Sequence, residues 1–280
     1  GWQLYSPAHV GYLIGFQANR NAQADVLLIA ILAQVALLSG ARPRLGERAA
    51  GMVALGGTLV LALACVFTGS RMGIALLPVA LAGGVAIWHP RLVGGRAAGL
   101  ALGGLVAGGL VAWLALRDNH ALGRIVSRFS QERDFRFELW EDTRYAIAAH
   151  WPFGSGMGSF RPVFIAAERL EVIDPSYPVR AHNDFLELLL EGGLFGAALL
   201  LGAIAVIGSV TVRAWRARSG GTRPQVLFAG LALGIVAMHS GVDYPLRSMA
   251  LAHLAAVAAG ILAACAQGRT SRDEKERPQS

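Results

Sequence analysis

Charged residues are scarce in this chain of 280 amino acids. Only 15% of the residues are charged, against about a quarter in an ordinary soluble domain, while 54% are hydrophobic. The apolar residues do not recur at the period of two or about 3.6 residues that half-buried strands and helices of soluble proteins show. They form unbroken runs instead. These features exclude a soluble globular domain and indicate a protein that crosses a lipid bilayer.

Cysteine is nearly absent as well. Cys65 and Cys265 lie late in the second and in the last apolar run, which the topology below assigns to opposite faces of the membrane, so we expect no disulfide between them. The chain begins Gly1-Trp2-Gln3, without a methionine and without the basic stretch, short apolar segment and cleavage site of a secretory signal. We therefore expect a fragment of a longer protein that lacks earlier helices.

Motifs for metals and nucleotides are also missing. The sequence has no H-E-x-x-H, no cysteine pair and no clustered aspartates in the segments expected outside, so we predict neither a metal nor another cofactor. Gly154-Ser155-Gly156-Met157-Gly158 lacks the Lys-Ser/Thr that follows a phosphate-binding loop. The net charge of +7 comes from loops expected inside the cell and no aromatic-basic motif accompanies it, which argues against a nucleic-acid partner.

The apolar runs number seven. We place them near residues 24–38, 49–67, 72–88, 97–116, 188–212, 226–238 and 249–266. A spanning helix needs about 17 residues or more, so the first and sixth runs are the weakest and either extend into their polar flanks, tilt or re-enter. The prediction is an all-α integral membrane protein with about seven transmembrane helices and one long, partly helical periplasmic loop. Four spans fall within residues 1–116, the loop covers 117–185, three spans fall within 186–266, and residues 267–280 form a disordered cytoplasmic tail.

The arginines set the orientation, because short loops rich in lysine and arginine stay in the cytoplasm. Three connections and the tail carry several such residues: Arg42, Arg44 and Arg48, then Arg91 and Arg96, then Arg213, Arg216, Arg218 and Arg223, and finally Arg269, Arg272, Lys275 and Arg277. The other short segments carry one arginine each, namely Arg20, Arg71 and Arg247. We expect these three segments on the outer side with the long loop, where all four can meet.

The outer loop has its own pattern of structure. Residues 134–150 interleave apolar and charged side chains as an amphipathic helix does, and Pro152 with three alternating glycines then predicts a turn with exposed backbone amides. A second short helix is expected through residues 164–170. Asn183 or Asp184 is suited to cap the following span.

Four residues are the candidates for a site. His182 stands where the loop meets a span, as either a structural helix-end residue or a general base. Arg71 lies in the very short connection between two spans. Its side chain either extends to the membrane–water interface or binds phosphate. Arg20 and Arg247 are ordinary interfacial charges one by one, but together with Arg71 they outline a cationic pocket beside His182.

Several segments carry a family resemblance. They are Gly15-Phe16 with Asn19-Arg20-Asn21, Ser70-Arg71-Met72-Gly73, Arg136 four residues before Trp140, Trp151-Pro152-Phe153-Gly154-Ser155-Gly156-Met157-Gly158-Ser159-Phe160, and Ala181-His182-Asn183-Asp184-Phe185-Leu186-Glu187. With them the sequence resembles the O-antigen ligase and O-antigen polymerase superfamily of bacterial membrane glycosyltransferases, whose members usually have several more spans. The resemblance implies transfer of a glycan from undecaprenyl pyrophosphate to an acceptor hydroxyl on the periplasmic face of the inner membrane.

The resemblance also implies roles. Arg71 matches a family arginine tied to pyrophosphate binding, and His182 matches the histidine proposed to take the acceptor's proton, whereas Arg20 and Arg247 are added from the topology. The acceptor stays open among a lipid-linked core sugar, a second lipid-linked glycan and a protein hydroxyl. No carboxylate suited to a two-step route stands out, so we expect inversion of the anomeric centre.

A membrane transporter of a small solute is the alternative, because some relatives are described in solute uptake and intramembrane charges can mark a pathway. Asp25 and Gln34 are nearly the only strongly polar side chains in the spans, and a pair of broken helices in matching halves is missing, which favours the enzyme.

Overall fold

The computed structural model describes residues 11–90, 136–169, 178–217 and 222–267. Within these ranges every regular element is a helix, in the order α1 (Arg20–Leu45), α2 (Glu47–Phe67), α3 (Arg71–Trp88), α6 (Arg136–His150), α7 (Phe160–Ala167), α8 (Asp184–Arg216), α9 (Arg223–Ser240), η4 (Pro245–Arg247) and α10 (Met249–Gln267). Five of them, α1, α2, α3, α8 and α10, are long and apolar enough to cross a membrane. The all-α membrane architecture is thereby confirmed, while the span predicted at residues 97–116 lies outside the described residues.

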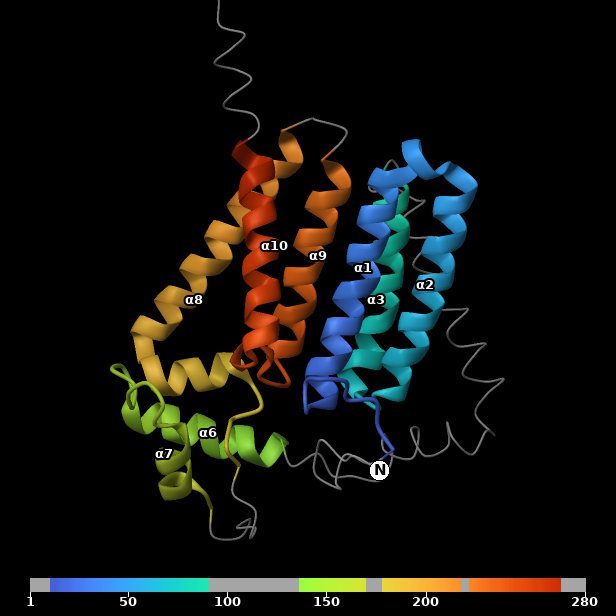
Figure 1. Ribbon diagram of the computed structural model, residues 1–280. Coiled ribbons are helices and arrows are strands. Elements are labelled where there is room, and N and C mark those ends of the chain that lie inside the picture. Colours follow the sequence, from blue (N-terminus) through green and yellow to red (C-terminus); the bar gives the residue numbers. More distant parts are fainter. Residues whose placement is uncertain (1–10, 91–135, 170–177, 218–221, 268–280) are drawn as a thin grey trace, which may run out of the picture.

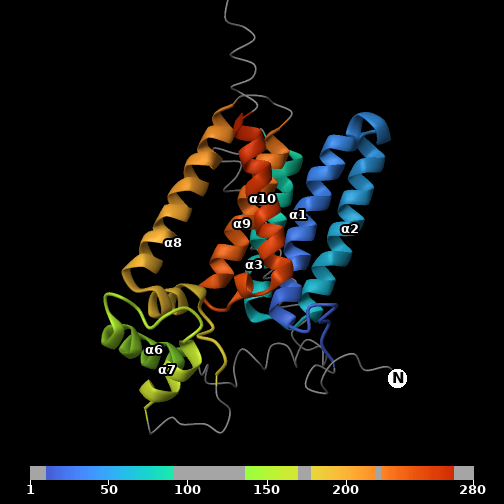
Figure 2. The ribbon, with the colours of Figure 1, turned by 60° about the vertical axis from the view of Figure 1, so that its left-hand side comes forward.

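Helix α1 stands at the centre of the bundle. It packs against α2, α3 and α9, and Leu28, Ile31 and Leu32 on it are fully buried. Figures 1 and 2 both show α1, α3, α9 and α10 side by side, with α2 and α8 on opposite flanks. The outward faces of α2 and α8 are apolar and exposed, as on Leu59 and Leu199, because lipid rather than protein is their expected neighbour.

The first and the sixth apolar runs, which are the weakest predicted spans, form helices that differ in length and hydropathy. The first becomes a helix of 26 residues, since Asn19 accepts hydrogen bonds from the amides of Asn21 and Ala22 and so starts the helix before the apolar run begins. The sixth becomes α9, which has 18 residues but is not among the five candidate spans. Its last turn is polar and buried, with His239 and Ser240 packed inside the bundle.

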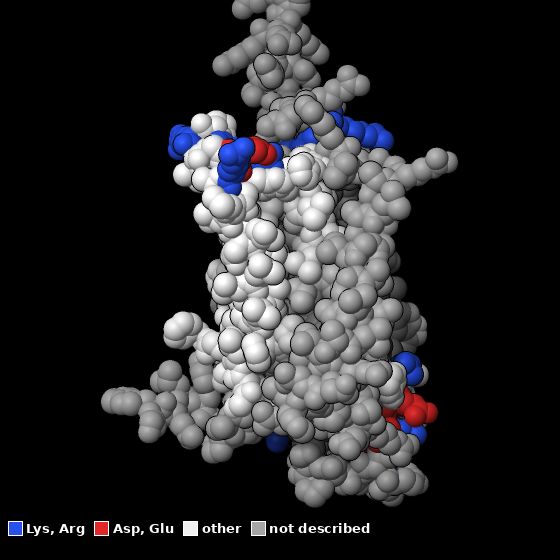
Figure 3. Space-filling model, turned by 90° about the vertical axis from the view of Figure 1, so that its right-hand side faces the viewer, with Lys and Arg blue, Asp and Glu red and all other residues white. Residues whose placement is uncertain are grey.

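Charge is concentrated at the two ends of the bundle. The α1–α2 and α8–α9 connections lie at one end, and the start of α1, the α2–α3 connection, η4 and helices α6 and α7 lie at the other, which we call the site end (Figure 1). Among the described residues visible in Figure 3, blue or red side chains lie at the two ends of this face, and the white surface between them shows none. This arrangement fits a bundle that crosses a bilayer. Cys65, near the site end, and Cys265, near the opposite end, are both free thiols.

Helix α8 is broken, and a small unit packs on its first part. Gly193 has a φ of 52° and a ψ of −137°, so residues 184–192 run crosswise to the rest of α8 (Figure 1). Helix α6, predicted over residues 134–150, lies against this crosswise part, and α7 lies beside both. An apolar cluster holds the unit together, formed by Leu139, Ala146, Phe160, Phe164, Ala181 and Leu190.

The turn after α6 inserts into the break of α8. The amides of Ser155 and Gly156 donate to the carbonyls of Leu190 and Glu191, at 2.8 and 3.0 Å, and the amide of Leu194 donates to the carbonyl of Pro152 at 2.8 Å. The prediction of exposed amides in this turn was therefore wrong, because the break of α8 frees carbonyls that accept them.

This contact requires glycine on both sides. A Cβ atom at Gly154 would lie 2.6 Å from the carbonyl oxygen of Glu191, and one at Gly193 would lie 2.2 Å from that of Pro152. Any side chain at either position would push the two backbones apart. The turn thereby fixes the angle at which the crosswise part of α8 leaves the span.

Candidate functional site

Four segments that are distant in the sequence lie at the site end (Figure 1). They are the first turn of α1, the α2–α3 connection, the residues just before α8, and the segment from the end of α9 to η4. Each holds one of the four residues that the sequence analysis selected, namely Arg20, Arg71, His182 and Arg247. The contacts of these residues differ.

His182 is fixed by the cap of α8. As predicted, Asn183 caps this helix, and its Oδ1 accepts hydrogen bonds from the amides of Phe185 and Leu186, each at 3.0 Å. Its side-chain amide donates to the carbonyl of Gly241 at 2.8 Å. His182 itself has a φ of 47°, a conformation that few residues other than glycine adopt. The cap therefore sets the direction in which the imidazole leaves the chain.

The imidazole of His182 contacts Asp243. Its Nδ1 lies 3.0 Å from Asp243 Oδ1, and its ring meets that of Tyr244 edge-on, with 4.9 Å between centroids. The other carboxylate oxygen of Asp243 accepts a hydrogen bond from the side-chain amide of Asn21, in the first turn of α1. Asp243 thus joins three of the four segments, a role that sequence reasoning missed because its two partners are 61 and 222 residues away.

The surroundings of Asp243 favour its charged form. Burial, the largest single influence, raises the pKa of this carboxyl, but the hydrogen bond of His182 and the nearby groups of His182, His239 and Arg136 together bring the pKa below its ordinary value. The pKa of Tyr244 is raised, first by burial and then by the charge of Asp243, so its phenol stays neutral. A carboxylate in contact with Nδ1 fixes the orientation of an imidazole, as it does for histidines that act as general bases.

Arg247 is surrounded by carboxylates. Its Nη2 lies 3.1 Å from Glu187 Oε1 and 3.4 Å from Glu191 Oε2, and its Nε lies 3.8 Å from Asp184 Oδ1. Arg180 adds a contact of 2.8 Å between its Nη1 and Glu187 Oε1. The prediction placed Arg247 in a cationic pocket, but its charge is compensated here. The spacing of the three acids, at three and four residues, places them on one face of α8 and was the signal available in the sequence.

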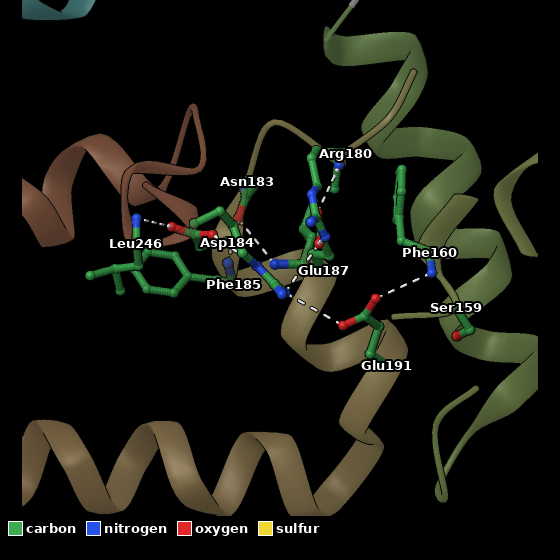
Figure 4. A network of polar contacts seen from close by, with 12 residues as sticks. Ser159, Phe160, Arg180, Asn183, Asp184, Phe185, Glu187, Glu191 and Leu246 are labelled. Carbon is green, nitrogen blue, oxygen red and sulfur yellow. Dashed lines mark hydrogen bonds and ion pairs between the residues drawn. The ribbon is translucent and has the colours of Figure 1, made fainter. Parts of the chain in front are cut away.

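The same carboxylates connect the crosswise part of α8 to its neighbours (Figure 4). Glu191 Oε1 accepts from the amide of Phe160 at 3.2 Å, which ties α8 to the start of α7. Asp184 Oδ2 accepts from Ser240 Oγ at 3.0 Å and from the amide of Leu246 at 3.3 Å. These bonds hold η4 and the end of α9 beside Asp184, the first residue of α8.

Tyr12 links Arg20 with the segment that carries Arg71. The guanidinium of Arg20 lies 5.4 Å from the centroid of the Tyr12 ring, and this ring packs over Gly69, which has a φ of 64°. Ser70 then caps α3 by accepting a hydrogen bond from the amide of Gly73 at 3.1 Å, so Arg71 is the first residue of that helix. A helix N-terminus carries positive potential, which adds to the charge of Arg71.

A cavity of about 220 Å³ opens between α1 and the segment from α9 to η4. Its lining includes Asn21, Asp25, His239, Asp243, Tyr244 and Arg247. Of the four predicted residues only Arg247 is among the lining residues. Asp243 and Tyr244, which contact the ring of His182, also line the cavity, so the cavity lies next to His182.

The described part of the chain holds no group of three or more histidine, cysteine, aspartate or glutamate residues arranged to bind a metal ion. The polar groups of the site instead pair with one another.

A helical bundle with five candidate spans defines a multi-pass membrane protein, and a histidine paired with an aspartate lies with several arginines at one end of it. The family model described as O-antigen ligase matches residues 56–201, just over half of the chain, and the chain belongs to that family. A search of curated proteins found no significant match. The family match includes Arg71 and His182, and family membership implies glycan transfer in a broad sense.

Proposed function

We propose that this protein transfers a glycan from an undecaprenyl-pyrophosphate carrier to an acceptor hydroxyl, at the periplasmic face of the bacterial inner membrane. The acceptor is a glycan, a lipid-linked core sugar or a protein hydroxyl, and membrane lipids surround the spans. The observation that carries the proposal is the contact between His182 and Asp243 in a chain of the O-antigen ligase family. Family membership supports the reaction class, and this contact supports the role of His182 as the base.

In the proposed reaction, Nε2 of His182 takes the proton of the acceptor hydroxyl as its oxygen attacks the anomeric carbon. The new glycosidic bond forms while the bond to the pyrophosphate oxygen breaks, and the pyrophosphate leaves with that electron pair. Arg71 and Arg20 neutralise the leaving group, since a guanidinium fork binds phosphate oxygens with two hydrogen bonds. Attack opposite the leaving group in one step inverts the anomeric centre.

Arg247 has a lesser part in this scheme. It reaches the cavity, but three carboxylates already compensate its charge. We therefore assign it to substrate binding at the cavity wall and assign Arg71 and Arg20 to the pyrophosphate.

The proposed topology has seven spans, with the site end in the periplasm. Its support is the arginine count together with the position of the arginine-rich connections at the end opposite the site (Figure 1). Single cysteines in a cysteine-free background, tested with an impermeant thiol reagent on spheroplasts, examine it. A cysteine at Ser155 should react and one at Gly220 should not, and the reverse pattern would overturn the topology.

A transfer assay tests the function. The protein in liposomes receives labelled undecaprenyl-pyrophosphate-linked glycan and, in separate reactions, a lipid-linked core sugar, a second lipid-linked glycan or a serine-containing peptide. His182→Ala should lower turnover per folded molecule by about 10²- to 10⁴-fold, as the removal of a general base does. The matched control is His253→Ala, because His253 is exposed on α10 and its Nδ1 contacts only the backbone of its own helix. Equal activity of the two variants would refute the catalytic assignment.

A further inference from the structure

Asp25 is a buried carboxylate of α1 with one oxygen unsatisfied. Its Oδ1 lies 2.6 Å from Nδ1 of His239, and both side chains are almost wholly buried. Its Oδ2 is buried and has no hydrogen-bond partner in the described part of the chain. A buried carboxylate oxygen without a donor costs free energy, so native structures rarely keep one without a reason. Asp25 lines the cavity at the site end, where a ligand can supply that donor.

The lining of the cavity selects for ligands that donate hydrogen bonds. Asp25 and Asp243 both contribute carboxylates to it, each in contact with a histidine, and the positive charge of Arg247 is compensated by the acids of α8. The lining residues therefore offer carboxylate oxygens as acceptors and no uncompensated arginine that would hold an anion such as pyrophosphate. Hydroxyl groups of a sugar would instead find acceptors. The chemistry of the cavity therefore fits the acceptor of the transfer rather than its leaving group.

The position and size of the cavity agree with this assignment. Asp243 and Tyr244 form part of its wall and are the residues that contact the ring of His182. A hydroxyl-bearing ligand in the cavity is thus next to the proposed base. Pockets for small molecules commonly measure about 300–1,000 Å³, so the 220 Å³ of this one suits a single sugar ring rather than an oligosaccharide.

We propose that the cavity is the acceptor subsite and that its occupant is the terminal sugar of a glycan. Asp25, held in place by His239, accepts a hydrogen bond from a hydroxyl of this sugar other than the one that attacks. The inference rests on the proposed function and narrows it, since a second hydroxyl on the acceptor distinguishes a sugar from a serine or threonine side chain. Asp25 is then a specificity residue and not part of the bond-forming machinery.

Kinetics with a modified acceptor test the inference. Labelled undecaprenyl-pyrophosphate-linked glycan serves as donor, and the acceptors are lipid-linked glycans whose terminal sugar lacks one hydroxyl at a time. For the unmodified acceptor, Asp25→Asn should raise the acceptor KM about 10-fold, equal to about 1.4 kcal/mol, and leave the donor KM unchanged. One deoxy acceptor should cost the wild-type protein a similar factor in kcat/KM and cost Asp25→Asn little more, because both changes remove the same hydrogen bond.

The matched control is Gln34→Leu. Gln34 is the other strongly polar residue of α1, but its side chain donates to Thr58 Oγ1 on α2 at 3.0 Å and does not line the cavity. Its loss should leave both KM values unchanged. The deoxy series on the wild-type protein needs no variant, so it decides the question even where Asp25→Asn folds poorly.

The outcomes separate this inference from the proposed function. Full activity of His182→Ala would refute the proposed mechanism itself. Loss of activity in His182→Ala, with a normal acceptor KM in Asp25→Asn and no deoxy acceptor impaired, would overturn the subsite alone. Efficient transfer to the serine-containing peptide with none to any glycan would overturn it as well.

Discussion

At the end of the bundle opposite the site, Arg42 pairs with Glu47 at 3.4 Å and lies 3.7 Å from the centroid of the Trp88 ring. Its acidic partner is 66% exposed. At the site end, Arg247 meets Glu187 and Glu191, whose side chains are fully buried. Exposed pairs contribute little to stability, but a buried carboxylate that loses its cation is costly. We therefore expect Arg42 to matter less for the stability of the fold than Arg247, whose loss leaves buried carboxylates without a cation.

Replacing Arg247 should have the largest effect on the stability of the fold, and it tests the difference between the two ends directly. Arg247→Ala removes a cation from Glu191 and Asp184, although Glu187 keeps Arg180, so the destabilisation should be about 3 kcal/mol. This corresponds to roughly 5 °C in apparent Tm for a chain of this length. Arg42→Ala should cost less, about 1–2 kcal/mol, because its pair with Glu47 is exposed while its guanidinium also contacts the ring and the carbonyl of Trp88. Thermal unfolding of both variants in one detergent measures the difference, and equal shifts would show that the two ends do not differ in this way.

Asp243 should affect activity more than any arginine of the site. Asp243→Asn keeps the shape but removes the charge that orients His182, so turnover should fall by roughly 10²-fold. Asp142→Asn is the matched control, since Asp142 is also buried and paired, with Arg169 at 2.6 Å in the α6–α7 unit. A normal turnover for Asp243→Asn would mean that His182 does not depend on this carboxylate.

The pKa of Asp243 fixes the pH at which its contribution disappears. Because the folded-state pKa is lowered, the carboxylate stabilises the fold above the ordinary aspartate pKa of about 3.9, and this contribution is lost as the pH falls through the lower folded-state value. The stability difference between wild type and Asp243→Asn should therefore shrink as the pH falls from about 5 to below 4. Thermal unfolding between about pH 3 and 6 checks it, and a difference that has already vanished near pH 6 would contradict the lowered pKa.

The next largest effect on transfer is expected from replacing Arg71. Arg71→Lys keeps the charge but loses the fork, so transfer should fall about 10-fold if the arginine holds pyrophosphate with two bonds. Arg44→Lys, at the opposite end, should have no effect on turnover. An equally small effect of both substitutions would indicate that Arg71 only snorkels to the interface.

Local patterns predicted much of this molecule. The apolar runs, the helix α6 and the cap at Asn183 each depend on residues close in sequence, and the structure contains them within the described residues. The amphipathic character predicted for α6 was wrong, because the helix buries Asp142 and exposes Phe137. The docking of the turn at Ser155 onto Leu190 was not predictable in this way, because its hydrogen-bond acceptor exists only where α8 breaks. The pairing of His182 with Asp243 likewise joins segments that only the folded bundle brings together.

The smallest expected effect concerns metals. The carboxylates beside His182 and Arg247 already have partners, since Asp243 contacts His182 and Asn21 while Asp184 accepts from Ser240. Arginines can neutralise pyrophosphate in place of a divalent cation, which needs several free oxygen ligands. Treatment with EDTA should therefore change turnover by less than about twofold. Loss of transfer that magnesium or manganese restores would instead make Asp243 and Asp184 candidate ligands, and the site end would then bind its substrate through a metal rather than through Arg71 and Arg20.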